Sequence, residues 1–316
     1  MGGNPTHAGR EIDVESLLEG RTAFIVGSAK NAGKTTFLNF ALGRLRHRGG
    51  PERRDDGARG EGPAHRHRGT GVGFLSIGVD GEARDLVFGN PKPRVRAEEG
   101  DLLVTTDRML SASELSCELL EVFPGTTVLG RLALVRVLRG GFVELAGPEH
   151  NEALSCALDA LHARGARTVL VDGAVDRLTQ AASREGAGIV FVVRAERSRL
   201  ASVQDSMRLL EALARVETAG EGASDAQELP GALTRDKLAA VPEDVRTLVL
   251  GDLTKVFLSW REWKAASARR EFRFRRRLEL LCFCVVLKDL SRAEFERGLE
   301  PAVLAKILYN PYEASA

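Results

Sequence analysis

Short apolar runs alternate with amphipathic stretches along most of the chain. Residues 22–26 form an apolar run that ends at Gly27, and such a run is typical of a buried strand. Apolar side chains then recur every fourth position from Phe37 to Leu45, so we expect a helix that begins near Lys34. Similar strand and helix patterns fill the second half of the chain. This order predicts an α/β fold with a doubly wound, mostly parallel sheet that helices cover on both faces.

The later elements are predicted from the same two periodicities. Further strands are expected at residues 72–77, 168–171, 188–193, 245–250 and 280–287, and helices over 154–161 and 200–210. A run at residues 269–277 interleaves Phe with Arg, a pattern that could stack on and neutralise nucleic acid. We interpret this run instead as a helix that leads into the last strand.

Residues 85–148 interrupt the alternation because this stretch looks rich in strands. Strand candidates are 92–96 and 102–106, and residues 128–138 and 142–145 are interpreted as a hairpin around a Gly-Gly turn. We interpret 85–148 as a β-rich insertion that forms a small subdomain. The insertion belongs to one nucleotide-binding domain of residues 21–316, which follows a tail of residues 1–20.

A basic, Gly-rich stretch at residues 44–70 shows no periodicity. It carries eight Arg against four acidic residues, a composition that predicts a solvated, disordered insert. Contact with nucleotide phosphates, nucleic acid or an acidic partner is the alternative interpretation.

Composition and charge favour a globular protein of the cytoplasm. Apolar residues make up 43% of the chain, enough for a core, and the net charge of +1 gives no overall attraction to nucleic acid. The apolar run at residues 280–287 falls well short of the roughly 20 residues that a membrane span needs. The N-terminus has no apolar segment of the secretory type. We therefore expect a cytoplasmic location, with neither membrane nor nucleic acid as a partner. Cys282 and Cys284 lie within that apolar run and are interpreted as core residues.

The segment between the first strand and the first long helix carries the chemistry. We interpret it as the phosphate-binding pattern G-x-x-x-x-G-K-[ST]. Glycines let backbone N–H groups approach phosphate oxygens closely, and the start of a helix attracts the same anion. Lys34 supplies a cation for the β- and γ-phosphates, and the Thr35 hydroxyl is a ligand for Mg²⁺. The predicted loop consists of Gly27, Ser28, Ala29, Lys30, Asn31, Ala32, Gly33, Lys34, Thr35 and Thr36.

Such a site also needs acidic residues beside the phosphates. Asp172 ends an apolar strand, and ligands of parallel sheets bind at such carboxyl ends, so we predict that Asp172 holds the magnesium ion. A cap of the next turn is the alternative role. Asp80 and Glu82 follow the second strand and are candidates for orienting the hydrolytic water or completing the magnesium shell, or else belong to a plain turn. Arg177 is a candidate arginine finger or a surface ion-pair partner.

The base is expected to be adenine. Guanine-specific P-loop proteins usually carry an N/T-K-x-D motif after a strand, and neither residues 234–236 nor residues 254–257 fit it. The residues after Asp172 also lack the D-x-x-G spacing of a GTPase switch. We therefore predict ATP and Mg²⁺ as the cofactors.

Several short blocks, taken in order, resemble one group within the P-loop NTPase superfamily. Together they look like the P-loop subunit of the lysine 5,6-aminomutase reactivase, over most of residues 20–310. The first block is specific by itself, and the others matter by their order. The blocks are residues 27–36, 76–82, 100–106, 143–148 and 171–177.

The resemblance implies an ATPase that reactivates a B12-dependent aminomutase by driving the exchange of damaged adenosylcobalamin. It implies a second reactivase subunit and the aminomutase as protein partners, and it leaves a homodimer open. The loop glycines, Lys34 and Thr35 would cradle the phosphates and Mg²⁺, with Asp172 behind them. Three alternatives stay open: a small-molecule kinase, a metallochaperone related to the nickel- and cobalt-insertion GTPases, and a nucleotide-gated binding module without turnover.

Overall fold

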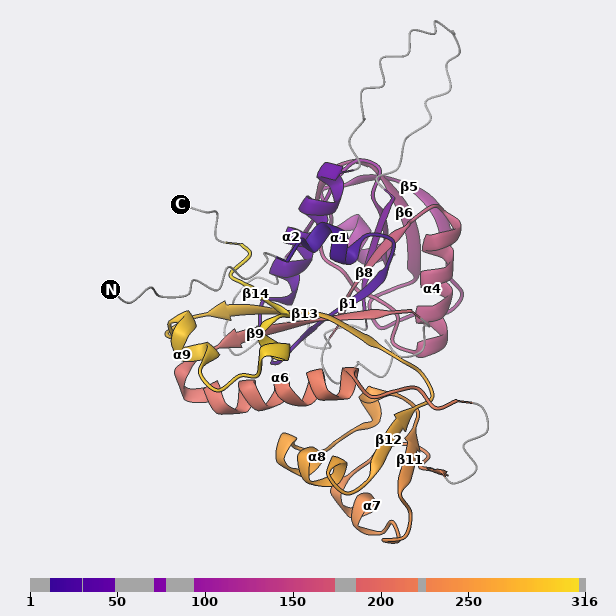
Figure 1. The fold of residues 1–316 in the computed structure, drawn as a ribbon. Coiled ribbons are helices and arrows are strands. Elements are labelled where there is room, and N and C mark those ends of the chain that lie inside the picture. The colour runs from indigo at the N-terminus through magenta and orange to yellow at the C-terminus, as the bar shows by residue number, and fades with distance from the viewer. Residues whose placement is uncertain are drawn as a thin grey trace, which may run out of the picture.

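A large, mostly parallel sheet forms the centre of the computed structural model, which describes residues 12–29, 31–48, 71–77, 94–173, 186–220 and 226–312. Nine strands of the described residues join in the order β14-β13-β9-β1-β8-β2-β4-β6-β5 (Figure 1). Every pair from β14 to β4 is parallel, whereas β6 is antiparallel to both β4 and β5. The expected α/β class with a mostly parallel sheet is therefore confirmed. The strands are β14 (Ile307–Tyr309), β13 (Glu279–Leu287), β9 (Gly188–Ala195), β1 (Thr22–Gly27), β8 (Thr168–Gly173), β2 (Val72–Ser76), β4 (Leu102–Thr106), β6 (Leu132–Arg139) and β5 (Ser116–Val122).

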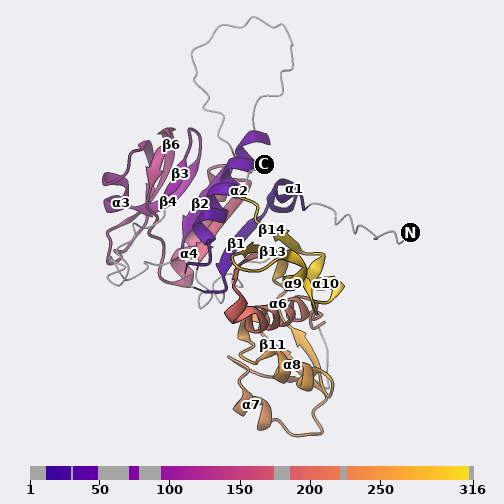
Figure 2. The same cartoon turned by 90° about the vertical axis from the view of Figure 1, so that its left-hand side faces the viewer.

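Helices cover both faces of this sheet and bury its two sets of side chains. On one face, α1 (Val14–Leu18) and α2 (Lys34–Arg48) enclose a core that includes Ile25 and Phe74 (Figure 2). On the other face, α4 (Asn151–Ala163) and α6 (Leu200–Ala214) enclose a core that includes Phe24 and Leu75. Successive residues of β1 and β2 thus point to opposite cores. Both faces are apolar, which is why these strands appear as continuous apolar runs.

The cysteines of β13 belong to this core, as expected. Cys282 and Cys284 are fully buried, and burial raises the pKa of both thiols, that of Cys284 to about 12. Both side chains are therefore neutral at physiological pH. They fill space between β13 and its neighbours.

A second, smaller sheet lies beyond α6, at one end of the molecule (Figure 1). It consists of three parallel strands, β10 (Ala226–Glu228), β11 (Thr247–Leu250) and β12 (Glu271–Phe274), accompanied by α7 (Arg235–Ala239) and α8 (Trp260–Ser267). The predicted helix over residues 269–277 is therefore wrong. Phe272 and Phe274 are buried while their neighbours are not, and this period of two is that of a strand.

The β-rich stretch does not form the separate subdomain expected from the sequence. Three of its strands, β4, β5 and β6, extend the central sheet, and only β3 (Val95–Ala97) and β7 (Gly141–Val143) form a small antiparallel ribbon. The expected hairpin around the Gly-Gly turn is also wrong, because β6 pairs with β4 and β5 whereas β7 pairs with β3. The two glycines serve close packing instead. A Cβ on Gly140 would lie 2.8 Å from the Ala97 carbonyl oxygen, and one on Gly141 would lie 2.9 Å from that of Glu114.

The remaining segments complete the described structure. Residues 14–18 of the expected N-terminal tail form α1, and residues 44–48 of the expected basic insert belong to α2; residues 49–70 lie outside the described residues. None of the described helices is both long enough and apolar enough to cross a lipid bilayer. The short helices still to be introduced are α3 (Asp107–Ser111), α9 (Arg292–Glu296) and α10 (Pro301–Leu304), with single turns at η2 (Arg197–Arg199) and η3 (Leu253–Lys255).

Candidate functional site

The predicted phosphate loop lies at the centre of the carboxyl edge of the main sheet. It follows β1, which pairs with β8 on one side and β9 on the other, and it leads directly into α2. In open α/β sheets, ligands bind outside the carboxyl ends of the strands. The start of the 15-residue helix α2 adds backbone N–H groups and the positive end of its dipole at the same place.

Counting along the loop corrects one detail of the predicted motif. Five residues separate Gly27 from Gly33, whereas the pattern G-x-x-x-x-G-K-[ST] has four, so Ser28 stands where the pattern has its first glycine. Gly27 is instead the last residue of β1, paired with Val192, and the Ser28 N–H donates to the Val192 carbonyl at 2.9 Å. A Cβ on Gly27 would lie 3.0 Å from Cγ of Lys34 and 3.1 Å from Cβ of Ala32. Gly27 therefore lets the loop fold back over the end of β1, with the Lys34 stem across it.

The loop backbone then turns sharply before the helix begins. Asn31 has φ of 61° and Gly33 has φ of 101°, both in the left-handed region, which Asn tolerates and Gly occupies freely. The Ala32 N–H donates to the Ala29 carbonyl at 3.3 Å, and the Phe37 N–H donates to the Gly33 carbonyl at 2.9 Å. The second bond starts the helix at Lys34, as predicted. The loop residue Lys30 lies outside the described residues.

Thr35 and Asp172 meet at the head of α2. The Thr35 Oγ1 donates a hydrogen bond to Asp172 Oδ2 at 3.0 Å, although 137 residues separate them in the sequence. The contact arises because β8 is the direct neighbour of β1, with Asp172 in register with Ile25. A hydroxyl and a carboxylate at this separation are hard oxygen donors of the kind that Mg²⁺ prefers, so the two residues fit the predicted metal role.

Described residues from all five sequence blocks meet at the carboxyl edge around Asp172. The Ile77 N–H donates to the Asp172 carbonyl at 2.8 Å, which joins the end of β2 to the end of β8. Gly147 packs so tightly on the end of β2 that a Cβ there would lie 1.6 Å from the Ser76 carbonyl oxygen. Buried Thr105, in β4, accepts a hydrogen bond from the Ala146 N–H at 3.0 Å. Residues 143–148 are thus held against the ends of β2 and β4.

Thr105 and Gly147 were not predicted as site residues from the sequence. The signals they offered, a Thr at the end of an apolar run and a Gly-Pro pair, are common in chains without any ligand site. Only the three-dimensional pairing of β2, β4 and β8 gives these residues a position near Asp172.

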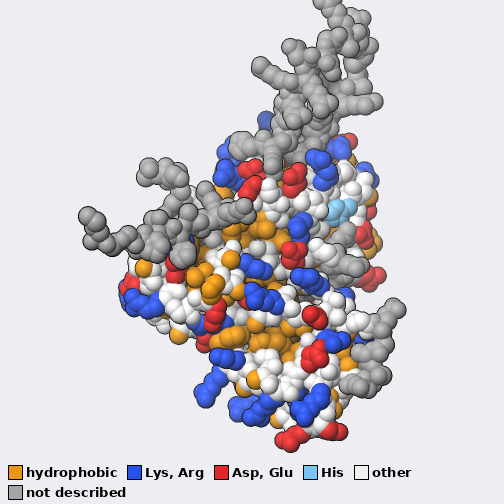
Figure 3. All heavy atoms as spheres, viewed as in Figure 1, with side chains coloured by type: hydrophobic (Ala, Val, Ile, Leu, Met, Phe, Trp, Pro, Cys, Tyr) orange, Lys and Arg blue, Asp and Glu red, His pale blue; other side chains and the backbone are white. Residues whose placement is uncertain are grey.

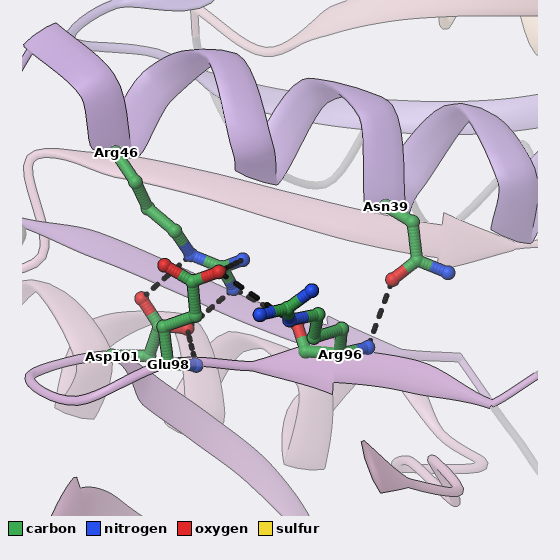
Figure 4. Close-up of polar contacts among 5 residues, drawn as sticks. All are labelled: Asn39, Arg46, Arg96, Glu98 and Asp101. Atoms are coloured by element: carbon green, nitrogen blue, oxygen red, sulfur yellow. Dashed lines mark hydrogen bonds and ion pairs between the residues drawn. The ribbon is translucent and has the colours of Figure 1, made fainter. Parts of the chain in front are cut away.

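A buried polar cluster fixes α2 along its length. The Arg46 guanidinium donates to both carboxylate oxygens of Asp101, at 3.2 and 2.5 Å, and also to the Arg96 carbonyl (Figure 4). Asp101 is fully buried and accepts a further bond from the Glu98 N–H. About two turns closer to the loop, Asn39 accepts from the Arg96 N–H at 2.9 Å. We call these five residues the Arg46 cluster; it ties α2 to β3 and to the turn before β4.

Asp80, Glu82 and Arg177 lie outside the described residues, so their roles in orienting water or neutralising charge stay predictions. Lys34 is half-buried at the first position of α2, and Thr36 is exposed. The geometry therefore brings together Gly27, Lys34, Thr35 and Asp172.

Comparisons with protein-family models, with curated proteins and with solved structures found no match to this chain. The structure thus defines an α/β protein with a mostly parallel sheet, a glycine turn before a helix, and a Thr–Asp pair at the start of that helix.

Proposed function

We propose that this protein is a Mg²⁺-dependent P-loop ATPase. The observation that carries the proposal is the 3.0 Å contact between Thr35 Oγ1 and Asp172 Oδ2, next to a loop that folds over the end of β1. Two oxygen donors of the right kind thus meet beside the start of a helix, where a phosphate group is best stabilised.

Each residue then has a defined task. The backbone N–H groups of the loop and of the first turn of α2 bind the phosphates, and the Lys34 ammonium neutralises their charge. The Thr35 hydroxyl and the Asp172 carboxylate hold Mg²⁺, directly or through water. When bound, Mg²⁺ supplies positive charge that offsets the charge developing on the phosphate oxygens. Asp80 and Glu82 are the candidates for orienting the attacking water, and Arg177 for charge neutralisation in the transition state.

Replacement of Lys34 tests the nucleotide site. Lys34→Ala is expected to weaken ATP binding by a factor of about 100 or more, because it removes the cation beside the phosphates. Binding would be measured by isothermal titration calorimetry, with circular dichroism to show that the fold is retained. Lys264→Ala, an exposed lysine of α8, is the matched control. Unchanged ATP affinity in Lys34→Ala would overturn the proposal.

Substitutions of the neighbouring threonines Thr35 and Thr36 distinguish metal binding from phosphate binding. Thr35→Ala is expected to lower Mg²⁺-dependent hydrolysis about 100-fold, because it removes a metal ligand, while Mg²⁺-free nucleotide binding changes little. Thr36→Ala serves as the control because Thr36 is the exposed neighbour. Phosphate release at a range of Mg²⁺ concentrations is the measurement. Equal effects of the two substitutions would argue against Thr35 as the metal ligand.

The role of the ATPase is proposed from the resemblance of the five blocks to the reactivase subunit. We place this protein as the nucleotide-driven part of a factor that exchanges damaged adenosylcobalamin in an aminomutase of the lysine 5,6-aminomutase type. Described residues from all five blocks lie at one edge of the sheet, which supports the interpretation that they belong to one site. The test is ATP-dependent release of cyanocobalamin from a purified aminomutase, with Lys34→Ala as the inactive control. ATP hydrolysis without release would remove the partner assignment and leave the ATPase standing.

The alternatives make different predictions. A small-molecule kinase should release no phosphate without an acceptor, so acceptor-independent hydrolysis would exclude it. A metallochaperone needs protein ligands for its metal cargo, and the described residues contain no group of three or more His, Cys, Asp or Glu positioned to hold a metal ion. Nothing in that part of the chain therefore favours the metallochaperone. Tight ATP binding without hydrolysis would point to the nucleotide-gated binding module.

A further inference from the structure

A cavity separates the central sheet from the small sheet, away from the phosphate loop. Its volume is about 540 Å³, and its walls come from α6, α8, α10 and the start of β12. Figure 3 shows hydrophobic side chains gathered in the seam between α6 and the lower part of the molecule, with Lys and Arg along its rim. Cavities of this size at the junction of two substructures are typical of small-molecule sites.

Aromatic side chains form one wall of the cavity. Trp260 and Trp263 are one helical turn apart on α8, so both face the same side of that helix. The Trp263 ring lies 4.6 Å, centroid to centroid, from the ring of Phe272 in β12. A capping box between Ser259 and Glu262 fixes the start of α8 and thereby the position of both indoles.

A buried carboxylate faces this wall from α6. Glu211 lines the cavity and is only 6% exposed. Its Oε1 atom accepts no hydrogen bond from any described residue. The same Oε1 atom lies 2.5 Å from Arg215 Nε in an ion pair that lacks hydrogen-bond geometry, and the Arg215 side chain is 61% exposed to solvent. The buried carboxylate is thus held by an exposed cation in poor hydrogen-bond geometry, and a better-oriented ammonium donor in the cavity can take the place of that cation.

Two other arginines of the cavity, Arg208 and Arg270, already have several partners. The Arg270 guanidinium donates to the carbonyls of Val241, Pro242 and Val245. Arg208 binds Asp205, Glu300 and the Gly298 carbonyl. These two arginines are structural, so an anion would find few free donors, whereas the partner of Glu211, Arg215, is exposed and can be displaced.

We propose that this cavity binds a small organic ammonium compound. Its ammonium group donates to Glu211, displacing or joining the exposed Arg215, and its apolar stem lies against Trp260, Trp263 and Phe272. Aromatic faces and a carboxylate are the two groups that attract an ammonium ion most strongly in proteins. The site uses no residue of the phosphate loop and stands independently of the ATPase proposal.

The two tryptophans allow a direct test, because they are the only two in the chain and both line the cavity. Intrinsic fluorescence therefore reports on this site alone. Titration of the full-length protein with n-butylammonium chloride is expected to give a saturable change in emission. The uncharged n-butanol and the anionic butyrate, at matched ionic strength, are expected to bind at least 10-fold more weakly. Absence of saturation with the ammonium probe, or equal binding of butyrate, would overturn the proposal.

Two substitutions test the role of Glu211. Glu211→Gln keeps the shape and removes the charge, so the affinity for n-butylammonium is expected to fall at least 10-fold. Glu228→Gln, on exposed β10, is the control and should leave it unchanged. Should Glu211→Gln fail to fold, Arg215→Gln replaces it as the test, because loss of the competing cation should tighten n-butylammonium binding several-fold. Unchanged affinity in a folded Glu211→Gln, or weaker binding in Arg215→Gln, would show that Glu211 does not hold the ammonium group.

Discussion

The centre and the far edge of the same nine-stranded sheet differ in how tightly their side chains are held. In the centre, β1 and β8 have neighbours on both sides and cores on both faces, and Leu170 of β8 is fully buried. At the edge, β5 pairs only with β6, and Leu119 and Val122 are 61% and 48% exposed. The Thr35–Asp172 pair lies in the centre, where surrounding structure fixes each atom. The candidate site thus lies where packing leaves its side chains the least freedom.

Removal of a buried charge is expected to give the largest difference in stability between a well-packed region and the edge of the sheet. Asp101→Asn leaves the Arg46 guanidinium without its counter-charge in a buried place and should cost about 3–5 kcal/mol of unfolding free energy. The corresponding change at the edge is Glu118→Gln, which breaks the partly exposed ion pair with Arg136 and should cost about 1 kcal/mol or less. Urea unfolding of both variants is the measurement. Similar losses would mean that the Arg46 cluster is no more rigid than the edge.

Apolar truncation makes the same comparison without charge. Leu170→Ala in β8 is expected to cost about 2–5 kcal/mol, because it leaves a cavity between two packed layers. Leu119→Ala in β5 is expected to change stability by about 0.5 kcal/mol or less, because that side chain is already in water. Thermal and urea unfolding would compare the two. A large loss for Leu119→Ala would show that something covers the edge in solution.

The smallest expected effect concerns acid stability beside β9. Hydrogen bonds from the Arg197 side chain, and then from Ser291, lower the pKa of Glu294 from 4.5 to about 2. A carboxylate whose pKa is lower in the folded state adds stability above its unfolded pKa and loses that contribution as the pH falls through its folded pKa. Wild type should therefore exceed Glu294→Gln in stability at pH 5, and the gap should close between about pH 4.5 and pH 2. Urea midpoints at several pH values would measure it, and a gap that is independent of pH would contradict the assignment.

The same contrast explains what could be predicted from the sequence. The strands with two buried faces, β1, β2, β8, β9 and β13, produce continuous apolar runs, and their positions were predicted closely. β5 was missed because its residues Glu118, Leu119 and Leu120 follow no clear alternation, and its register with β6 shifts twice. The small sheet was missed because nothing local distinguishes β11 from a strand of the main sheet.

The residues of the candidate site that could be predicted are likewise those with a local signal in the sequence. Lys34 and Thr35 could be read from a local motif, and Asp172 from the end of an apolar strand. Thr105, Gly147 and the Arg46 cluster could not, because each depends on contacts between segments far apart in the chain. In the motif itself, counting along the sequence shows that Ser28 and not Gly27 stands at the first glycine position, and the pairing of β1 with β9 adds that Gly27 ends the strand.

Helix α2 connects the candidate site to the Arg46 cluster. With 15 residues, α2 is about 22 Å long; it begins at the candidate phosphate loop, and Arg46 near its other end binds Asp101. If the first turn of α2 tilts, either the ribbon of β3 and β7 moves with the helix, or the buried contact between the Arg46 guanidinium and the Asp101 carboxylate breaks. A displacement of Thr35 that tilted α2 would therefore also load the contacts of Arg46 with Asp101 and β3.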